Sequence, residues 1–141
     1  MVVDGQGGKL GRMLIEQLKA RLPELAITAI GTNSIATATM LKAGADAGAT
    51  GENPVVVGAK RADVILGPVG IIIADALWGE ITKKMANAIG TAPAKKILLP
   101  YNKCDVMIVG TQGMSPTEAV REAVEQTVRY IQENEERNQK V

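Results

Sequence analysis

The chain has 141 residues, of which 46% are apolar and 22% charged, a length and composition typical of one globular domain with its own hydrophobic core. Its 16 lysines and arginines nearly balance its 15 aspartates and glutamates, and with one tryptophan, two tyrosines and no phenylalanine it offers no stacking surface, so nucleic-acid binding is not expected. The absence of histidine and the presence of a single cysteine, Cys104, exclude a disulfide framework, a cysteine-based zinc site and a Ser-His or Cys-His nucleophile.

The predicted elements mostly alternate between strands and helices along the chain. They are a strand at residues 1–4, a helix at 9–22, a strand at 25–30, a helix at 35–43, a loop at 44–53, a short helix at 54–61, a strand at 62–66, a helix at 83–89, strands at 96–100 and 106–109, and a long helix from 116 to about 131. Residues 71–79 are apolar on nearly every face, so their period does not distinguish helix from strand.

Capping residues and prolines set several of these boundaries. Ser34 is in position to cap the second helix, and Asn53 before Pro54 favours a helix start there. Ser115, followed by Pro116 and later by a glutamate, predicts a capping box at the start of the last helix. Residues 132–141 are charged and bury nothing, so we expect this tail to fray.

This alternation predicts an α/β fold with about five mainly parallel strands, helices on both faces and a long C-terminal helix, in a single domain over residues 1–131. The first strand is short for a central strand, because ordinary strands have about five or six residues. Either the native start lies upstream of Met1 or the sheet has a short centre.

Polar, glycine-rich sequence follows four predicted strands. In parallel α/β sheets, ligands bind beyond the carboxyl ends of the strands, near the point where the strand order reverses. The predicted binding residues therefore come from these four segments: Gly5, Gln6, Gly7, Gly8, Gly11, Thr32, Asn33, Ser34, Gly67, Gly70 and Asn102.

The first of these segments, DGQGGKLG at residues 4–11, has four glycines and is expected to join a strand to a helix, where backbone N–H groups can bind a phosphate. The spacing departs from two familiar signatures. Leu10 stands where a dinucleotide fingerprint needs glycine and also where a Walker loop needs serine or threonine. Asp4 would repel a phosphate unless Mg²⁺ or a proton intervenes. The alternative is a tight turn with close helix-to-sheet packing.

The second segment carries the neutral groups of Thr32, Asn33 and Ser34 and no acidic residue for a ribose hydroxyl, which favours NADP over NAD if either binds. Simple helix capping by Ser34 is the alternative.

Reactive side chains suggest a small enzyme as a second hypothesis. Lys103 could act as a base or pair with a ligand charge, and it could lower the pKa of the neighbouring Cys104 thiol. The candidate carboxylates are Asp4, Asp75 and Glu80. They could move a proton or hold Mg²⁺, although capping and solvation also explain such residues. No resident metal site is predicted.

Several segments together resemble a family of short bacterial proteins described as domain of unknown function 3842. They are DGQGGKLG at residues 4–11, GTNSIAT at 31–37, LKAGA at 41–45, GATGENP at 48–54, GPVGI at 67–71, GEIT at 79–82 and NKC at 102–104. The resemblance covers nearly the whole chain and implies a Rossmann-like doubly wound domain, with no particular reaction. Two features depart from the family: a shorter first strand, and Lys9 where a further glycine is often found.

The leading hypothesis is thus a domain that binds a nucleotide or another small phosphorylated molecule. A third hypothesis is a homo-oligomeric interaction protein with structural glycines, in which residues 69–78 and the last helix form a homodimer face. No apolar run approaches the length of a membrane span and no leader sequence is recognisable, so we expect a cytoplasmic protein without a membrane partner.

Overall fold

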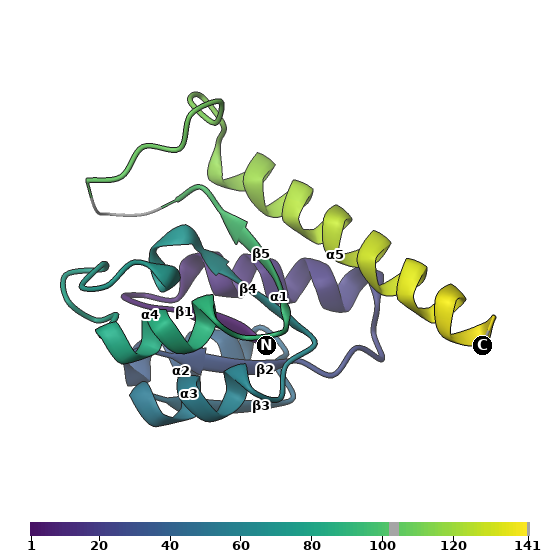
Figure 1. Cartoon of the computed structure of the whole chain (residues 1–141), viewed down its shortest axis with the longest axis horizontal. Coiled ribbons are helices and arrows are strands. Elements are labelled where there is room, and N and C mark those ends of the chain that lie inside the picture. Colours follow the sequence, from purple (N-terminus) through teal and green to yellow (C-terminus); the bar gives the residue numbers. More distant parts are fainter. Residues whose placement is uncertain (102–104, 141) are drawn as a thin grey trace.

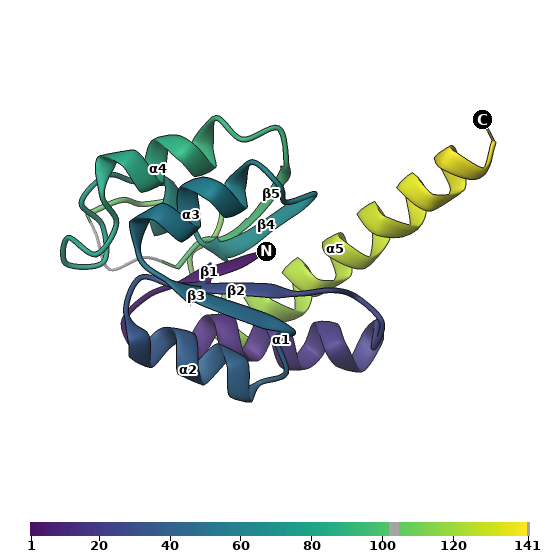
Figure 2. The same cartoon turned by 90° about the horizontal axis from the view of Figure 1, so that it is seen from below.

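The computed structural model describes residues 1–101 and 105–140, which form a parallel β-sheet with helices on both faces (Figures 1 and 2). The elements follow in the order β1 (Val2–Asp4), α1 (Lys9–Arg21), β2 (Thr28–Gly31), α2 (Ser34–Lys42), β3 (Ala47–Thr50), α3 (Glu52–Ala59), β4 (Val64–Pro68), the 3-10 helix η1 (Val69–Ile72), α4 (Lys83–Gly90), β5 (Lys95–Leu99) and α5 (Pro116–Gln139). The predicted α/β, Rossmann-like fold with its long C-terminal helix is confirmed.

Within the described residues, the sheet has five strands in the order β3-β2-β1-β4-β5, and every pair is parallel. β1 is central although it has only three residues. The chain moves from β1 outward to β2 and β3, then returns to the other side of β1 to form β4 and β5. The strand order therefore reverses between β1 and β4, which is the position where ligands bind in this class of sheet.

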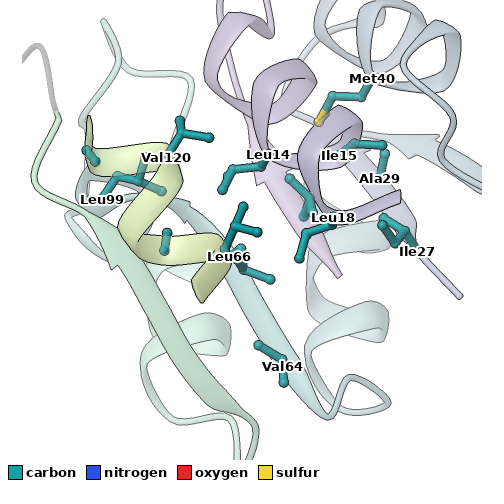
Figure 3. Close-up of a cluster of buried hydrophobic side chains, with 14 of the residues drawn as sticks. Leu14, Ile15, Leu18, Ile27, Ala29, Met40, Val64, Leu66, Leu99 and Val120 are labelled. Carbon is teal, nitrogen blue, oxygen red and sulfur yellow. The ribbon is translucent and has the colours of Figure 1, made fainter. Parts of the chain in front are cut away.

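Side chains alternate between the two faces of the short central strand, as a pleated strand requires. Val2 faces a core formed with α1, α2 and α5, whereas Val3 faces a second core formed with α3, α4 and η1. Figure 3 shows the first core, in which Leu14 and Leu18 of α1 and Val120 of α5 lie over one face of the sheet. Complete burial of side chains of this size contributes about 1.5–3 kcal/mol each, so α1 and α5 are held to the sheet mainly by apolar packing.

Two predictions in the loops are wrong. The predicted loop at 44–53 contains the edge strand β3, whose small and largely exposed residues lack an apolar alternation but pair with β2 from Thr28↔Ala47 to Gly31↔Thr50. The predicted strand at 106–109 does not form. Met107 is instead 77% exposed and Val109 89% exposed, so the side chains of this run do not cover a face of the sheet.

The helix ends also differ from the sequence-based expectation. Asn33, and not Ser34, is the N-cap of α2, because its side-chain oxygen accepts a 2.9 Å hydrogen bond from the Ala36 N–H. The capping box of Ser115 and Glu118 forms as predicted. α5 continues to Gln139, beyond the predicted end, because its last residues are mostly good helix formers. This final part projects past the sheet (Figures 1 and 2).

Candidate functional site

The loops that follow β1 and β2, and the connection that follows β4, meet at the carboxyl edge of the sheet. The first is the glycine loop, residues 5–8, which leads into α1. The second is the β2–α2 turn with Thr32 and Asn33, and the third is the long connection from β4 to α4. Hydrogen bonds join all three, as described below. The structure thus brings together the first two segments that the sequence assigned to this edge, and Glu80, rather than the predicted Gly67 and Gly70, joins them from the connection after β4.

Asp4 anchors the glycine loop from the end of β1. Its Oδ1 accepts a 2.8 Å hydrogen bond from the Gly5 N–H, and its Oδ2 accepts one of the same length from the Gly11 N–H in α1. Burial raises the pKa of the Asp4 carboxyl above its ordinary value, the two N–H groups act in the opposite direction, and the nearby charge of Glu80 raises the pKa further. Both oxygens thus hold the glycine loop between the end of β1 and the start of α1.

Close packing accounts for three of the four glycines at residues 5–11. A Cβ on Gly5 would lie 2.7 Å from Thr32 Oγ1, and one on Gly11 would lie 2.9 Å from Met40 Cγ, both too close for real atoms. Gly8 has φ 71°, a left-handed conformation that other residues adopt at a cost, and its Cβ would lie 2.9 Å from the Ala36 Cα. For these three positions, the alternative of a tight turn with close packing is sufficient.

Gly7 differs from the other loop glycines. It is exposed, a Cβ on it would meet no atom within 4 Å, and its φ lies outside the left-handed region. Its N–H takes part in none of the hydrogen bonds recorded between described residues. No contact within the described chain requires glycine here, so Gly7 leaves an open backbone surface at the mouth of the loop.

Glu80 joins the glycine loop to the β2–α2 turn. Its Oε2 accepts hydrogen bonds from the Gln6 N–H at 2.7 Å and from Thr32 Oγ1 at 2.8 Å, and its Oε1 accepts one from Asn33 Nδ2 at 3.0 Å. The Asn33 amide also donates to the Gln6 carbonyl oxygen at 2.9 Å. Three donors from two loops therefore converge on one carboxylate, and we call these three neutral groups the oxyanion-binding donors.

Glu80 lies in an irregular segment, residues 73–81, between η1 and α4. Three of its non-glycine residues have left-handed φ angles, Asp75 at 64°, Leu77 at 57° and Trp78 at 58°. Leu77 is buried in the second core, whereas Trp78 is 89% exposed. Leu77 therefore anchors the segment in the core, and Trp78 lies at its exposed tip. The Glu80 carboxylate is directed at the glycine loop.

A pocket of about 290 Å³ adjoins the glycine loop on the side of β4. Gln6, Gly7 and Lys9 line one side, and the remaining wall comes from Asp4, Leu10, Met13, Pro68, Leu77, Tyr101 and Pro116. A larger groove, of about 1030 Å³, lies beside the amino ends of the strands and the projecting part of α5. We assign the candidate site to the smaller pocket because it lies at the strand-order reversal and next to the oxyanion-binding donors.

Other predicted residues lie apart from this pocket or outside the described part of the chain. Ser34 and Asp75 are exposed, and no side-chain hydrogen bond joins either to the glycine loop in the described residues. Gly67 is buried in β4, where a Cβ would collide with the Val3 carbonyl, and Gly70 belongs to η1. Asn102, Lys103 and Cys104 lie outside the described residues.

The sequence pattern missed the apolar part of the pocket. Leu77 belongs to the stretch whose period was ambiguous, and Tyr101, whose hydroxyl donates to the Met114 carbonyl oxygen at 2.7 Å, was not assigned to the site. The hydrophobic run at 71–79 indicated that some of its side chains are buried, but it did not indicate which loop they contact. Glu80 was identified only as one of several carboxylates, because its partners lie 47 or more positions away.

The described part of the chain, residues 1–101 and 105–140, has neither a metal-binding cluster nor a membrane-spanning helix. No group of three or more His, Cys, Asp or Glu side chains in this part of the chain is arranged to hold a metal ion. No helix there is both long and apolar enough to cross a membrane.

Comparison with known proteins agrees with the resemblance found in the motifs. Residues 1–132 match the family described as Domain of unknown function (DUF3842). The matched range contains every helix and strand from β1 to β5 and most of α5. Searches of curated proteins and of solved structures returned no match. With its β1 glycine loop, its β2–α2 turn and nearly its full length within the match, the chain belongs to the DUF3842 family.

Proposed function

We propose that the protein binds a small ligand carrying a phosphate group at the carboxyl edge of its sheet, and that a nucleotide is the first class to test. The observation that carries this proposal is the convergence of the Gln6 N–H, Thr32 Oγ1 and Asn33 Nδ2 on the two carboxylate oxygens of Glu80. A phosphate group presents oxygens with a similar charge and hydrogen-bonding capacity, so the same donors suit it.

The open surface at Gly7 supports the same assignment. Packing accounts for Gly5, Gly8 and Gly11, but no contact among the described residues accounts for Gly7. Glycine at such a position lets a ligand approach the backbone closely and leaves its N–H accessible. The exposed Lys9, which lines the same pocket, adds a positive charge without an ion pair in the described residues.

The pocket beside the loop suits the uncharged part of such a ligand. Its volume of about 290 Å³ lies near the lower limit of ordinary ligand pockets, and Leu10, Met13 and Leu77 supply apolar wall. A planar base or a short apolar group would bury surface there while its phosphate lies against the glycine loop. In this proposal the phosphate binds at the polar glycine loop, and the uncharged part of the ligand binds in the apolar pocket beside it.

The choice between NADP and NAD changes once the fold is known. The sequence favoured NADP because no acidic residue follows β2, but the structure places the Glu80 carboxylate against Thr32 and Asn33. A carboxylate that stays there repels a 2′-phosphate and accepts a ribose hydroxyl, whereas one that moves aside frees the same donors for a phosphate. NADP and NAD therefore enter the test as equal candidates.

The two alternative functions have weaker support. Lys103 and Cys104, on which the enzyme hypothesis depends, lie outside the described residues, and both Asp4 oxygens bind the loop. The proposed homodimer face at residues 69–78 is partly used within the chain, since Ile71, Ala76 and Leu77 are buried in the second core, whereas Ile72 and Trp78 are exposed. Oligomerisation remains a proposal that a concentration-dependent molecular mass would test.

The test is the thermal unfolding midpoint with NADP, NAD, ATP, GTP, FMN and coenzyme A, each with and without Mg²⁺. A ligand at about one hundred times its dissociation constant stabilises a fold by about 2.7 kcal/mol, which corresponds to several degrees for a domain of this size. We expect at least one ligand to raise the midpoint of the wild-type protein.

Two variants with side chains of matched shape locate the binding. Gly7→Asp and Gly7→Asn both fit the open space, but only the aspartate adds a charge that repels phosphate. We expect Gly7→Asp to abolish the ligand shift and Gly7→Asn to reduce it less, with both ligand-free proteins folded. No shift for any ligand, or equal shifts in the two variants, would contradict binding of phosphate at the glycine loop.

A further inference from the structure

The segment at residues 73–81 occupies the oxyanion-binding donors of the glycine loop and the β2–α2 turn. Glu80 uses both carboxylate oxygens for this purpose, and they take up the Gln6 N–H, Thr32 Oγ1 and Asn33 Nδ2 together. A ligand phosphate that used these three donors would meet the Glu80 carboxylate at the same position. The site proposed above is thus filled by a side chain of the protein itself.

The segment is largely bonded to itself and linked to the glycine loop by one side chain. The Asp75 N–H donates to the Ile81 carbonyl oxygen at 2.7 Å, and the Gly79 N–H donates to the Asp75 carbonyl oxygen at 3.1 Å. Among the hydrogen bonds of the described residues, those of Glu80 alone connect the segment to the glycine loop and to the β2–α2 turn. This one polar link therefore holds the segment against the two loops, and its loss lets the segment move away from them.

The backbone of the segment is in a conformation that its own residues disfavour. Asp75, Leu77 and Trp78 have left-handed φ angles, and a tryptophan in that region is uncommon. The exposed Trp78 ring contributes almost no burial in return. Such strain persists where surrounding contacts enforce it, and here these contacts are the burial of Leu77 and the hydrogen bonds of Glu80.

From these three observations we infer that residues 73–81 form a displaceable cover and that Glu80 acts as an internal competitor for the phosphate of the ligand. The cover is closed when Glu80 holds the donors, and it opens when a phosphate group replaces the carboxylate. This inference rests on the proposed function and adds a regulatory contact to the same site.

The competition has a measurable consequence. The apparent dissociation constant of a ligand is its intrinsic value divided by the fraction of protein in the binding-competent state. If the cover is open in about one molecule in ten, removal of the competing carboxylate strengthens binding about tenfold. Gln is the appropriate replacement, because Glu80→Gln keeps the shape of the side chain but removes its charge and replaces one accepting oxygen with a donating amide.

The experiment is a calorimetric titration of inorganic pyrophosphate into the wild-type protein, Glu80→Gln and Asp75→Asn. Asp75→Asn is the matched control because it removes the same charge from the same segment, at an exposed side chain that does not contact the donors, and asparagine tolerates a left-handed φ. We expect Glu80→Gln to bind pyrophosphate about tenfold more tightly than the wild type, and Asp75→Asn to bind it as the wild type does.

Hydrogen exchange of the wild-type protein supplies a second readout that needs no variant. Saturation with pyrophosphate should speed exchange of the amides of residues 75–81, as the cover opens, and should slow exchange of the Gln6 amide. Unchanged exchange in the cover, or equal affinities of the wild type and Glu80→Gln, would overturn the inference and leave the proposed function standing.

Failure of pyrophosphate binding has two distinct meanings. If pyrophosphate binds neither protein while a nucleotide shifts the thermal midpoint, the ligand site exists but a phosphate does not replace Glu80, and the inference is overturned. If pyrophosphate binds neither protein and no nucleotide causes a shift, both the inference and the proposed function are overturned.

Discussion

The Glu80 carboxylate accepts a 2.7 Å hydrogen bond from the backbone N–H of Gln6, a residue 74 positions earlier in the chain. This contact joins the segment after β4 to the glycine loop after β1, and the bonds to Thr32 and Asn33 extend it to the turn after β2. Ligands bind at the carboxyl edge in doubly wound sheets. In this protein the hydrogen-bond donors at that edge already hold the carboxylate of Glu80.

The loop glycines should fall into two classes of stability. Gly8→Ala is expected to lower the free energy of unfolding by about 1–3 kcal/mol, because alanine is disfavoured at φ 71° and its methyl group meets the Ala36 backbone. Gly7→Ala, with open space around it, should change that free energy by less than about 0.5 kcal/mol. Urea unfolding of both variants measures the difference, and equal losses would disprove the division of the loop into packed and open glycines.

Asp4 should be needed to hold the loop. Asp4→Asn replaces one of the two accepting oxygens with an amide that cannot accept a hydrogen bond, so either the Gly5 or the Gly11 N–H loses its partner. We expect a loss of about 1–3 kcal/mol in the free energy of unfolding. The same chemical change at the exposed Asp75 is the control and should have little effect. A stable Asp4→Asn variant would remove Asp4 from its anchoring role.

Asp46 should make the free energy of unfolding depend on pH in the acidic range. Its carboxylate accepts hydrogen bonds from the Ile27 N–H and from Lys19 Nζ, and these contacts lower its pKa below the ordinary value of 3.8. A lowered pKa in the folded state stabilises the protein above the unfolded-state pKa, and this contribution disappears as the pH falls through the folded-state pKa.

The wild type should therefore be more stable than Asp46→Asn at pH 7, and the difference should shrink below a pH of about 4. Urea unfolding of both proteins at neutral and acidic pH tests this. A difference that is the same at both pH values would show that the ionised carboxylate is not its source.

The end of α5 should contribute little to stability. The described residues after Gln132 are exposed or half-buried, whereas Val124 is buried against the first core. Removal of residues 133–141 should change the free energy of unfolding by less than about 0.5 kcal/mol, and Val124→Ala should lower it by about 1–3 kcal/mol. Denaturant unfolding of the two variants compares them. A larger effect of the truncation would indicate that the projecting part of α5 belongs to the folded core.

The common edge of the site could be predicted from the sequence because the carboxyl ends of parallel strands all lie on one side of the sheet. The turn after β2 and the glycine loop after β1 follow from that rule alone. β3 could not be predicted, since its AGAT residues pair through backbone groups and lie at the sheet edge, where side chains carry no apolar alternation.

The contact between Glu80 and the glycine loop was also beyond sequence reasoning. Its segment turns through left-handed residues that include a leucine and a tryptophan, for which no turn pattern exists. The opposite error occurred at residues 106–109, where a run of apolar residues predicted a strand. With Met107 and Val109 exposed and no partner strand in the described chain, hydrophobicity alone was insufficient there.

The measurement that tests the central claim most directly is the affinity of Glu80→Gln for pyrophosphate with and without a second change, Thr32→Val, which removes one oxyanion donor and keeps its shape. If the donors that hold Glu80 bind the ligand phosphate, Glu80→Gln should bind pyrophosphate and the double variant should lose about tenfold or more in affinity, the value of a hydrogen bond to a charged group. Equal affinity of the two folded variants, or no binding by either, would contradict the claim that this edge of the sheet is an anion site.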